Sequence, residues 1–138
     1  MKRRELSIQI SPRRKIACEE YSKGDRSKSS KFIAIHGWLD NLATWFNFVP
    51  DFISKMENAT VLCIDLAGHG NSSHRDSRTY LLTDYVIDVY RVVQTLGWKR
   101  FGLIGRMYFL SVRHENEEKK EKSYLDTHTH AQTRWAAA

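Results

Sequence analysis

The chain has 138 residues, of which 41% are hydrophobic and 12% aromatic, so its composition is that of one globular domain rather than a disordered chain. The formal net charge is +6, and the excess lies in the first 31 residues, which hold ten Lys and Arg against four Asp and Glu. No apolar run approaches the roughly 20 residues that a membrane span requires, and two cysteines are too few for a disulfide framework.

The first predicted elements are two short strands, 6–10 and 15–18, joined by a turn at Ser11-Pro12-Arg13. Residues 6–10 alternate apolar and polar side chains, which is typical of a half-buried strand. Residues 22–31 are polar and predict a loop that contributes nothing to the core. The N-terminal region therefore predicts a β-hairpin followed by a loop.

Residues 32–105 predict alternating strands and helices. Continuous apolar runs predict buried strands at 32–35, 61–64 and 101–104. A helical stretch is predicted over 42–55, where Pro50 marks a restart or a kink. This order is that of a parallel sheet with helical crossovers.

The strongest helical pattern covers residues 83–96. Thr83 is placed to cap its start, Asp84 suits the positive N-terminal end, and Gly97 suits the C-terminal stop. The stripe predicted to face the core consists of Val86, Val89, Val93 and Leu96, with Tyr85 and Val92 beside it.

Cys18 and Cys63 each lie in an apolar, strand-like run, so we expect buried free thiols and a reducing compartment. The basic start has no apolar run of signal-peptide length behind it, and no peroxisomal signal ends the chain. We therefore expect a cytoplasmic protein, with a peroxisomal or vesicular location left open.

Residues 106–138 differ in character from the rest. They contain no Gly or Pro, and the run from His114 to Lys122 is highly charged. No apolar face is long enough to bury. The sequence thus predicts two parts: a folded region, 1–105, and a divergent tail, 106–138, that is disordered or helical.

Two loops carry the motifs, and each directly follows a predicted buried strand. The first is His36-Gly37-Trp38-Leu39-Asp40-Asn41, and the second runs from Asp65 through Gly68-His69-Gly70 to Ser72. In this order, with a helix and then Leu103-Ile104-Gly105 behind them, they resemble the α/β-hydrolase superfamily, most closely its serine hydrolase-like (kraken-type) members. The resemblance covers about residues 5–105 and implies an α/β-hydrolase fold.

The resemblance also implies roles for these loops. In such a fold the His-Gly turn brings backbone N–H groups over the C-terminal end of the sheet, so Gly37 and Trp38 would form an oxyanion-hole segment. His36 would be structural or line the pocket rather than act as the catalytic base. The residues expected to shape the second loop and tie it down are Asp65, Gly68, Gly70 and Ser72.

The nucleophile position departs from the family pattern. The family places Gly-x-Ser-x-Gly here, on a sharp strand-to-helix turn. The sequence reads Gly105-Arg106-Met107-Tyr108-Phe109, so the first Gly is present, Met107 replaces the nucleophile, and Phe109 replaces the second Gly. A thioether cannot form an acyl-enzyme. We therefore assign no catalytic residue.

The acid and base that follow the nucleophile in the family have no convincing counterpart. Only 29 residues follow Phe109, and the His and Asp residues among them lie in the charged tail. His128 and His130 alone are weak evidence for a metal site. We expect no metal and no cofactor, and we interpret the chain as a truncated α/β hydrolase, inactive alone. Its relatives would act on small ester-like substrates.

Two alternatives stay open. A non-catalytic binding or regulatory fragment would pair with another chain, its own copy included, through an exposed edge at 101–104. A nucleic-acid binder would rest on a basic arm alone, and a solvated strand pair explains that arm better, so we expect no nucleic-acid partner. The basic residues of the arm are Lys2, Arg3, Arg4, Arg13, Arg14 and Lys15.

Overall fold

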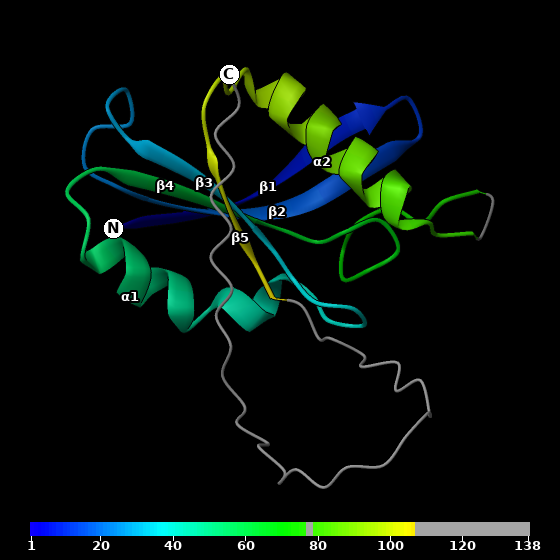
Figure 1. Ribbon diagram of the computed structural model, residues 1–138, viewed down its shortest axis with the longest axis horizontal. Helices are drawn as coiled ribbons and strands as arrows, with labels where there is room; N and C mark the ends of the chain where they lie inside the picture. The colour runs from blue at the N-terminus through cyan, green and yellow to red at the C-terminus, as the bar shows by residue number, and fades with distance from the viewer. Residues whose placement is uncertain (77–78, 107–138) are drawn as a thin grey trace, which may run out of the picture.

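The computed structural model describes residues 1–76 and 79–106, which form a five-stranded sheet with helices on both faces (Figure 1). In chain order the elements are β1 (Lys2–Ser11), β2 (Arg14–Lys23), β3 (Ser30–Ile35), the 3₁₀ helix η1 (Leu42–Trp45), α1 (Phe48–Ser54), β4 (Ala59–Ile64), α2 (Leu82–Leu96) and β5 (Gly102–Gly105). Apart from Arg106, the predicted tail lies outside the described residues.

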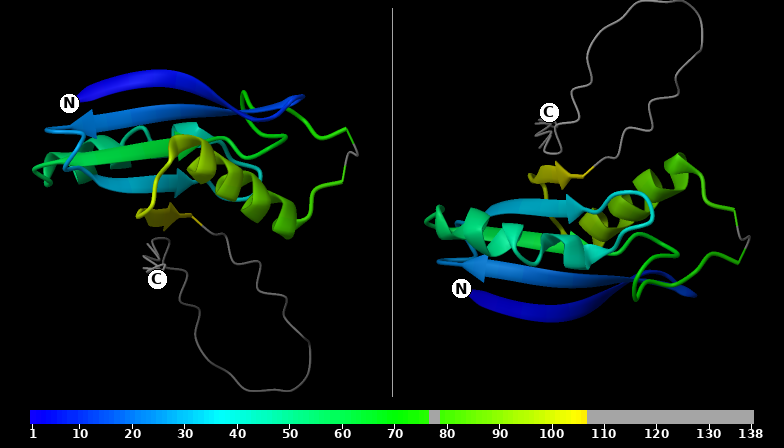
Figure 2. Two further views of the ribbon diagram at one scale, coloured as in Figure 1. Left: turned by 90° about the horizontal axis from the view of Figure 1, so that it is seen from above. Right: turned by 90° about the horizontal axis from the view of Figure 1, so that it is seen from below.

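The strand order is β1-β2-β4-β3-β5. β1 and β2 form an antiparallel hairpin, β2 pairs antiparallel with β4, and β3 pairs in parallel with both β4 and β5. The predicted hairpin followed by parallel strands is therefore confirmed. Within this sheet β1 and β5 are the two edge strands, as Figure 2 shows.

The two crossover helices cover opposite faces of the sheet (Figure 2). The connection from β3 through α1 moves toward the hairpin, whereas the connection from β4 through α2 moves back past β3 to β5. Because parallel crossovers are right-handed, opposite directions of travel place the helices on opposite faces. No helix in the described residues is long and apolar enough to cross a membrane.

Each face of the sheet buries its own set of side chains. Ile33, Leu62 and Ile64 lie in the core under α2, whereas Ala34 and Cys63 lie in the core under α1. This division follows from the alternation of side chains along a strand. Both central strands are thus covered on two faces, as their continuous apolar runs predict.

The two cysteines belong to different faces. Cys18 lies in the core under α2 and Cys63 in the core under α1, and both thiols are free and buried. Burial raises the pKa of each thiol to about 12. The prediction of buried free thiols is confirmed, and the sheet between them prevents a disulfide.

Several predicted strands are too short, and one predicted helical stretch is two helices. β2 continues to Lys23 and β3 begins at Ser30, so the loop predicted over 22–31 is shortened to residues 24–29. The stretch predicted as 42–55 divides into η1 and α1, with Pro50 in the first turn of α1, which confirms the restart. The end of β2 was missed because its buried side chains include Glu19 and Glu20.

The orientation predicted for α2 is wrong at Val86, whose side chain is 64% exposed. The buried side chains of α2 are instead Tyr85, Asp88, Val92 and Val93. Asp88 can be buried because it forms ion pairs with Arg14 and Arg75. A hydrophobic pattern cannot anticipate a carboxylate on the core face. The core face that it predicts is therefore displaced around the helix toward Val86.

The start of α2 also differs from the prediction. The N-cap position is Leu81, not Thr83, and the Asp84 carboxylate accepts a hydrogen bond from the Leu81 N–H at 3.1 Å. Asp84 therefore satisfies a free N–H group at the helix start. The predicted stop is confirmed, because Gly97 ends α2 in the left-handed conformation, with φ +63°.

Candidate functional site

The parallel strands β3, β4 and β5 end side by side at one edge of the sheet. Ile35 at the end of β3 is in register with Ile64 of β4 and with Gly105 of β5. The His36–Asn41 loop, the Asp65–Ser72 loop and the segment after Gly105 therefore start at one edge. Ligand sites in parallel α/β sheets lie at this end of the strands.

His36 links the first two loops. Its ring is buried; Nε2 accepts a hydrogen bond from the Leu66 N–H at 3.0 Å, and Nδ1–H donates to the Gly37 carbonyl at 2.7 Å. Burial is the main reason that the pKa of His36 lies below its ordinary value. With both ring nitrogens engaged, this neutral imidazole is not arranged to accept a substrate proton.

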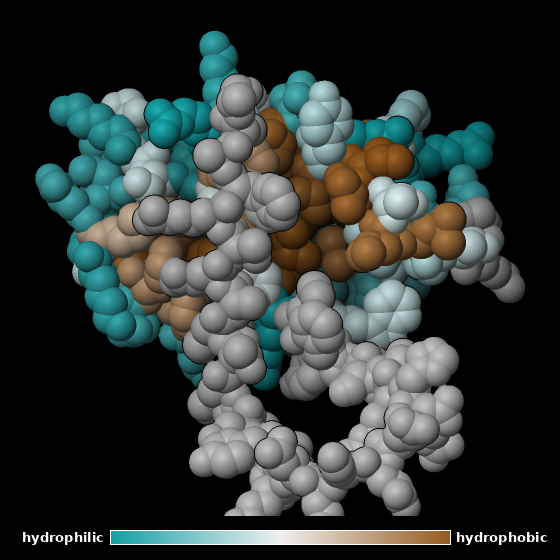
Figure 3. Space-filling view, in the orientation of Figure 1, coloured by the Kyte–Doolittle hydropathy of each residue, from teal (hydrophilic) through white to brown (hydrophobic). Residues whose placement is uncertain are grey.

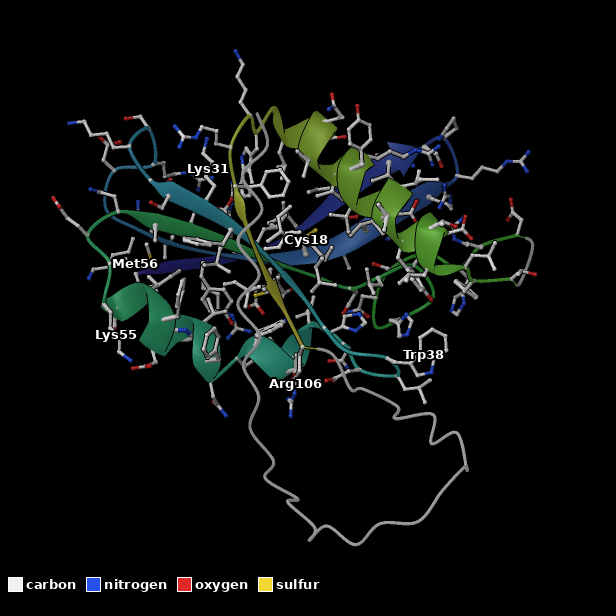
Figure 4. All side chains as sticks on the ribbon, viewed as in Figure 1. Cys18, Lys31, Trp38, Lys55, Met56 and Arg106 are labelled. Carbon is white, nitrogen blue, oxygen red and sulfur yellow. The ribbon has the colours of Figure 1, made fainter. Side chains whose placement is uncertain are left out.

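The residues after His36 form a tight turn. The Asp40 N–H donates to the Gly37 carbonyl at 3.2 Å, and Leu39 has φ +60°. A leucine seldom adopts this left-handed conformation, so the surrounding turn imposes it. Trp38 projects from the turn with 61% of its surface exposed (Figure 4).

The backbone N–H of Trp38 is the donor of the predicted oxyanion-hole segment. Among the residues that the structure describes, none accepts a hydrogen bond from the Trp38 N–H. The turn holds this donor on a strained backbone at the carboxyl end of β3. Gly37 itself is outside the left-handed region, so Leu39 carries the strain, which sequence reasoning did not predict.

Asp65 holds the second loop against the first. Its Oδ1 accepts from the Leu42 N–H at 2.7 Å, and its Oδ2 accepts from the Asn71 N–H at 2.9 Å. Its backbone carbonyl accepts from the Ser72 hydroxyl at 2.6 Å, and that hydroxyl accepts from the Ala17 N–H at 2.8 Å. Asp65 and Ser72 thus connect η1, the second loop and β2.

Gly68 and Gly70 both adopt positive φ, +81° and +47° respectively. A Cβ at Gly70 would lie 2.0 Å from Asp65 Oδ2, and one at Gly68 would lie 2.6 Å from the Tyr80 ring. Only glycine fits both the backbone conformation and the available space. The second loop is therefore packed as tightly as its two glycines indicate.

A group of rings adjoins the Trp38 turn. The His69 ring lies 4.9 Å from His36, 6.4 Å from Trp38 and 6.0 Å from Tyr85, measured between centroids. Tyr80 stacks on Tyr85 at 6.1 Å. Sequence reasoning did not assign these rings to the site, because Tyr80 and Tyr85 are remote in sequence and no spacing rule connects them.

The end of β5 completes the described part of the site. The Arg106 N–H donates to the Ile35 carbonyl at 3.2 Å, and Arg106 Nη1 donates to Thr44 Oγ1 at 2.7 Å. Figure 4 shows Arg106 and Trp38 at the same end of the sheet. Met107, the residue at the predicted nucleophile position, lies just outside the described residues, as do His128 and His130.

A hollow of about 420 Å³ lies elsewhere, between the hairpin and η1. Its walls include Glu5, Cys18, Leu42 and Phe46 but neither Trp38 nor His69. The described residues also contain no group of three His, Cys, Asp or Glu side chains placed to hold a metal ion.

Several N-terminal basic residues form ion pairs within the protein. Glu20 is buried and accepts bidentate hydrogen bonds from both Arg4 and Arg26, while Glu19 pairs with Arg3. Burial alone would raise the pKa of Glu20, but these guanidinium groups outweigh it and the pKa is lowered. With Arg14 paired to Asp88, three of the six basic residues of the arm thus form ion pairs within the protein.

Comparison with known proteins gives concordant matches. A family model described as the alpha/beta hydrolase fold matches residues 32–106. A serine hydrolase-like protein of Dictyostelium discoideum is 37% identical over 102 residues, which are 73% of this chain and 27% of that protein. A serine hydrolase-like protein of Danio rerio is 45% identical over 74 residues, which are 53% of this chain and 22% of that protein.

A solved structure agrees with both. The crystal structure of a hypothetical protein from Pseudomonas aeruginosa matches with a TM-score of 0.60 and 37% identity, over 73% of this chain and 33% of that one. The chain thus spans about a quarter of the length of these two curated relatives.

Proposed function

Because the chain belongs to the α/β-hydrolase family, in its serine hydrolase-like branch, we propose that it retains an oxyanion-hole segment without acyl-enzyme chemistry. In this proposal the chain binds a carbonyl- or oxyanion-bearing small molecule weakly and does not hydrolyse it. The family's ester-like substrates belong to its longer members.

Support for the oxyanion role comes from the Trp38 turn. The N–H of Trp38 has no acceptor among the described residues, and the strained turn that carries it is held by His36 and by the Gly37–Asp40 hydrogen bond. Preorganised backbone donors of this kind stabilise developing negative charge. Gly37 and Trp38 are accordingly the proposed ligand-contacting segment.

The observation that carries the inactive part of the proposal is the register of β5. Gly105 pairs with Ile35, and the Arg106 N–H donates to the Ile35 carbonyl, so β5 ends in register with the strand that leads into the Trp38 turn. A hydrolase of this family carries its nucleophile two residues after the first Gly of Gly-x-Ser-x-Gly, and counting from Gly105 this position of the sequence is Met107. Its side chain has no proton to lose and cannot be acylated.

The experiment is a hydrolysis assay on the full chain with p-nitrophenyl acetate and p-nitrophenyl butyrate. We expect a rate equal to that of an unrelated protein of similar charge, since exposed lysine and histidine side chains give a low background. Turnover above that background, abolished by a serine-directed phosphonate, would overturn the proposal.

A second candidate role is non-catalytic binding through the edge of the sheet. The observation favouring it is that β5 is the last strand of the described sheet and has one neighbour, β3. Strands with an unpaired edge pair readily with other chains. Pairing with a second copy or with a different chain would show as a larger species in sedimentation velocity. The role would be rejected if the chain neither self-associated nor bound a peptide.

A further inference from the structure

The outer edge of β5 has a defined set of backbone groups. The Arg106 N–H points toward β3, because it donates to Ile35. Along a strand successive backbone groups point to opposite sides, so the N–H and C=O of Leu103 and Gly105 point away from β3. Gly105 is exposed, and a Cβ there would meet nothing within 4 Å. No other strand among residues 1–76 and 79–106 pairs with this edge of β5.

Apolar surface adjoins the edge on the α2 face. α2 leaves Leu82, Val86, Ile87 and Tyr90 exposed, and Phe101 and Leu103 near β5 are only partly buried. Figure 3 shows hydrophobic side chains gathered on this face of the molecule, toward α2 and the centre of the sheet. An added strand would therefore find apolar neighbours as well as backbone partners.

The charges at the two ends of β5 have the same sign. Lys99 and Arg100 precede the strand and are exposed, and Arg106 follows it. Two copies related by a twofold axis would pair their β5 strands antiparallel, which places Lys99 and Arg100 of one copy near Arg106 of the other. Like charges brought together in this way disfavour a homodimer at this edge.

We propose that the β5 edge binds, by strand addition, an extended segment of a partner protein that is apolar at its centre and carries Asp or Glu at both ends. The inference rests on the second role proposed above and specifies its partner. Backbone N–H and C=O groups alternate along the edge, so they complement another polypeptide backbone, while the flanking cations select the acidic ends. RNA supplies the negative charge but not the matching backbone.

The test uses the full chain and a fluorescent nonapeptide with two Asp, a Val-Thr-Val-Tyr-Val centre and two Glu. A matched peptide carries Lys at the four terminal positions. Two variants differ in whether residue 105 keeps its outward N–H donor. Gly105→Pro removes this N–H but keeps the hydrogen bonds to β3, whereas Gly105→Ala keeps the N–H. Equal thermal midpoints of the two variants confirm that both fold.

We expect the acidic peptide to bind, Gly105→Pro to weaken binding about tenfold or more, and Gly105→Ala to change it by less than about twofold. The double variant Lys99→Glu, Arg100→Glu should shift preference toward the Lys peptide. The proposal would be overturned if the Pro and Ala variants bound the acidic peptide equally, or if the acidic and Lys peptides bound equally. It would also be overturned if oligouridylate displaced the acidic peptide and Gly105→Pro left the binding of oligouridylate unchanged.

The outcomes also separate this inference from the roles on which it builds. A dimer that Gly105→Pro dissociates would preserve binding at the β5 edge but contradict the proposed partner chemistry. If the chain were a monomer that bound neither peptide, both the proposed acidic partner and the proposed binding role of the β5 edge would be rejected. The ester assay is a separate readout, because it measures hydrolysis by the chain and not binding of a peptide to the β5 edge.

Discussion

Asp65 and His36 hold the site together through hydrogen bonds that join segments far apart in the sequence. Asp65 reaches η1 and its own loop, and His36 reaches across to Leu66. Sequence reasoning identified both residues through the motifs that contain them. The positive φ of Leu39 and the position of His69 could not be foreseen, because each depends on packing between loops rather than on local sequence.

Gly70→Ala tests the packing of the second loop. The new Cβ would collide with the Asp65 carboxylate in a backbone of φ +47°, so we expect a loss of about 3 kcal/mol in the free energy of unfolding, measured with urea. Gly97→Ala is the matched control, because Gly97 has φ +63° but open space around it, and should cost about 1 kcal/mol. Equal losses in the two variants would contradict the role of Asp65.

His36 predicts a pH dependence of stability. Its pKa is lowered in the folded state, so between the folded and unfolded pKa values the unfolded chain binds more protons. The stabilisation is complete above the ordinary pKa of about 6.5 and is lost as the pH falls below it. We expect the free energy of unfolding to fall between pH 7.5 and pH 5.

His36→Gln supplies the comparison, since its side chain can accept a hydrogen bond but does not titrate in this range. The variant should lose less stability than the wild type over the same pH interval. Identical pH profiles would mean that His36 titrates alike in the folded and unfolded chain.

Among the elements, α2 shows most clearly where an apolar pattern stops being sufficient. Its existence, its length and its stop at Gly97 were predictable, but its rotation was not. Burying Asp88 requires Arg14 from the hairpin and Arg75 from the loop before α2, and the sequence places neither beside it. The ion pairs join three segments and turn Val86 outward.

Removing the charge of Asp88 should loosen this junction. Asp88→Asn leaves two partly buried guanidinium groups without their carboxylate, and we expect a cost of about 3 kcal/mol in the free energy of unfolding. Asp51→Asn is the control, because its pair with Lys55 is exposed on α1 and should change stability by less than about 0.5 kcal/mol. If Asp88→Asn cost as little free energy of unfolding as Asp51→Asn, the ion pairs of Asp88 would not stabilise this junction.

For the whole molecule, the sequence was sufficient for the hairpin, the parallel strands, the crossovers and the family. Continuous apolar runs mark β3 and β4, because strands covered on both faces need no polar alternation. The strand order and the two separate cores required the structure. The ring group beside Trp38 and the outward groups of β5 also depend on how distant segments meet, which no local pattern encodes.

The central claim is that this α/β-hydrolase chain has no nucleophile at the end of β5. The most direct measurement is the intact mass of the full chain after incubation with a fluorophosphonate, with an active serine hydrolase treated in parallel. The account predicts that the mass of the chain stays unchanged while the control gains one phosphonyl group. Stoichiometric labelling of one serine in the native chain, absent after unfolding, would contradict it.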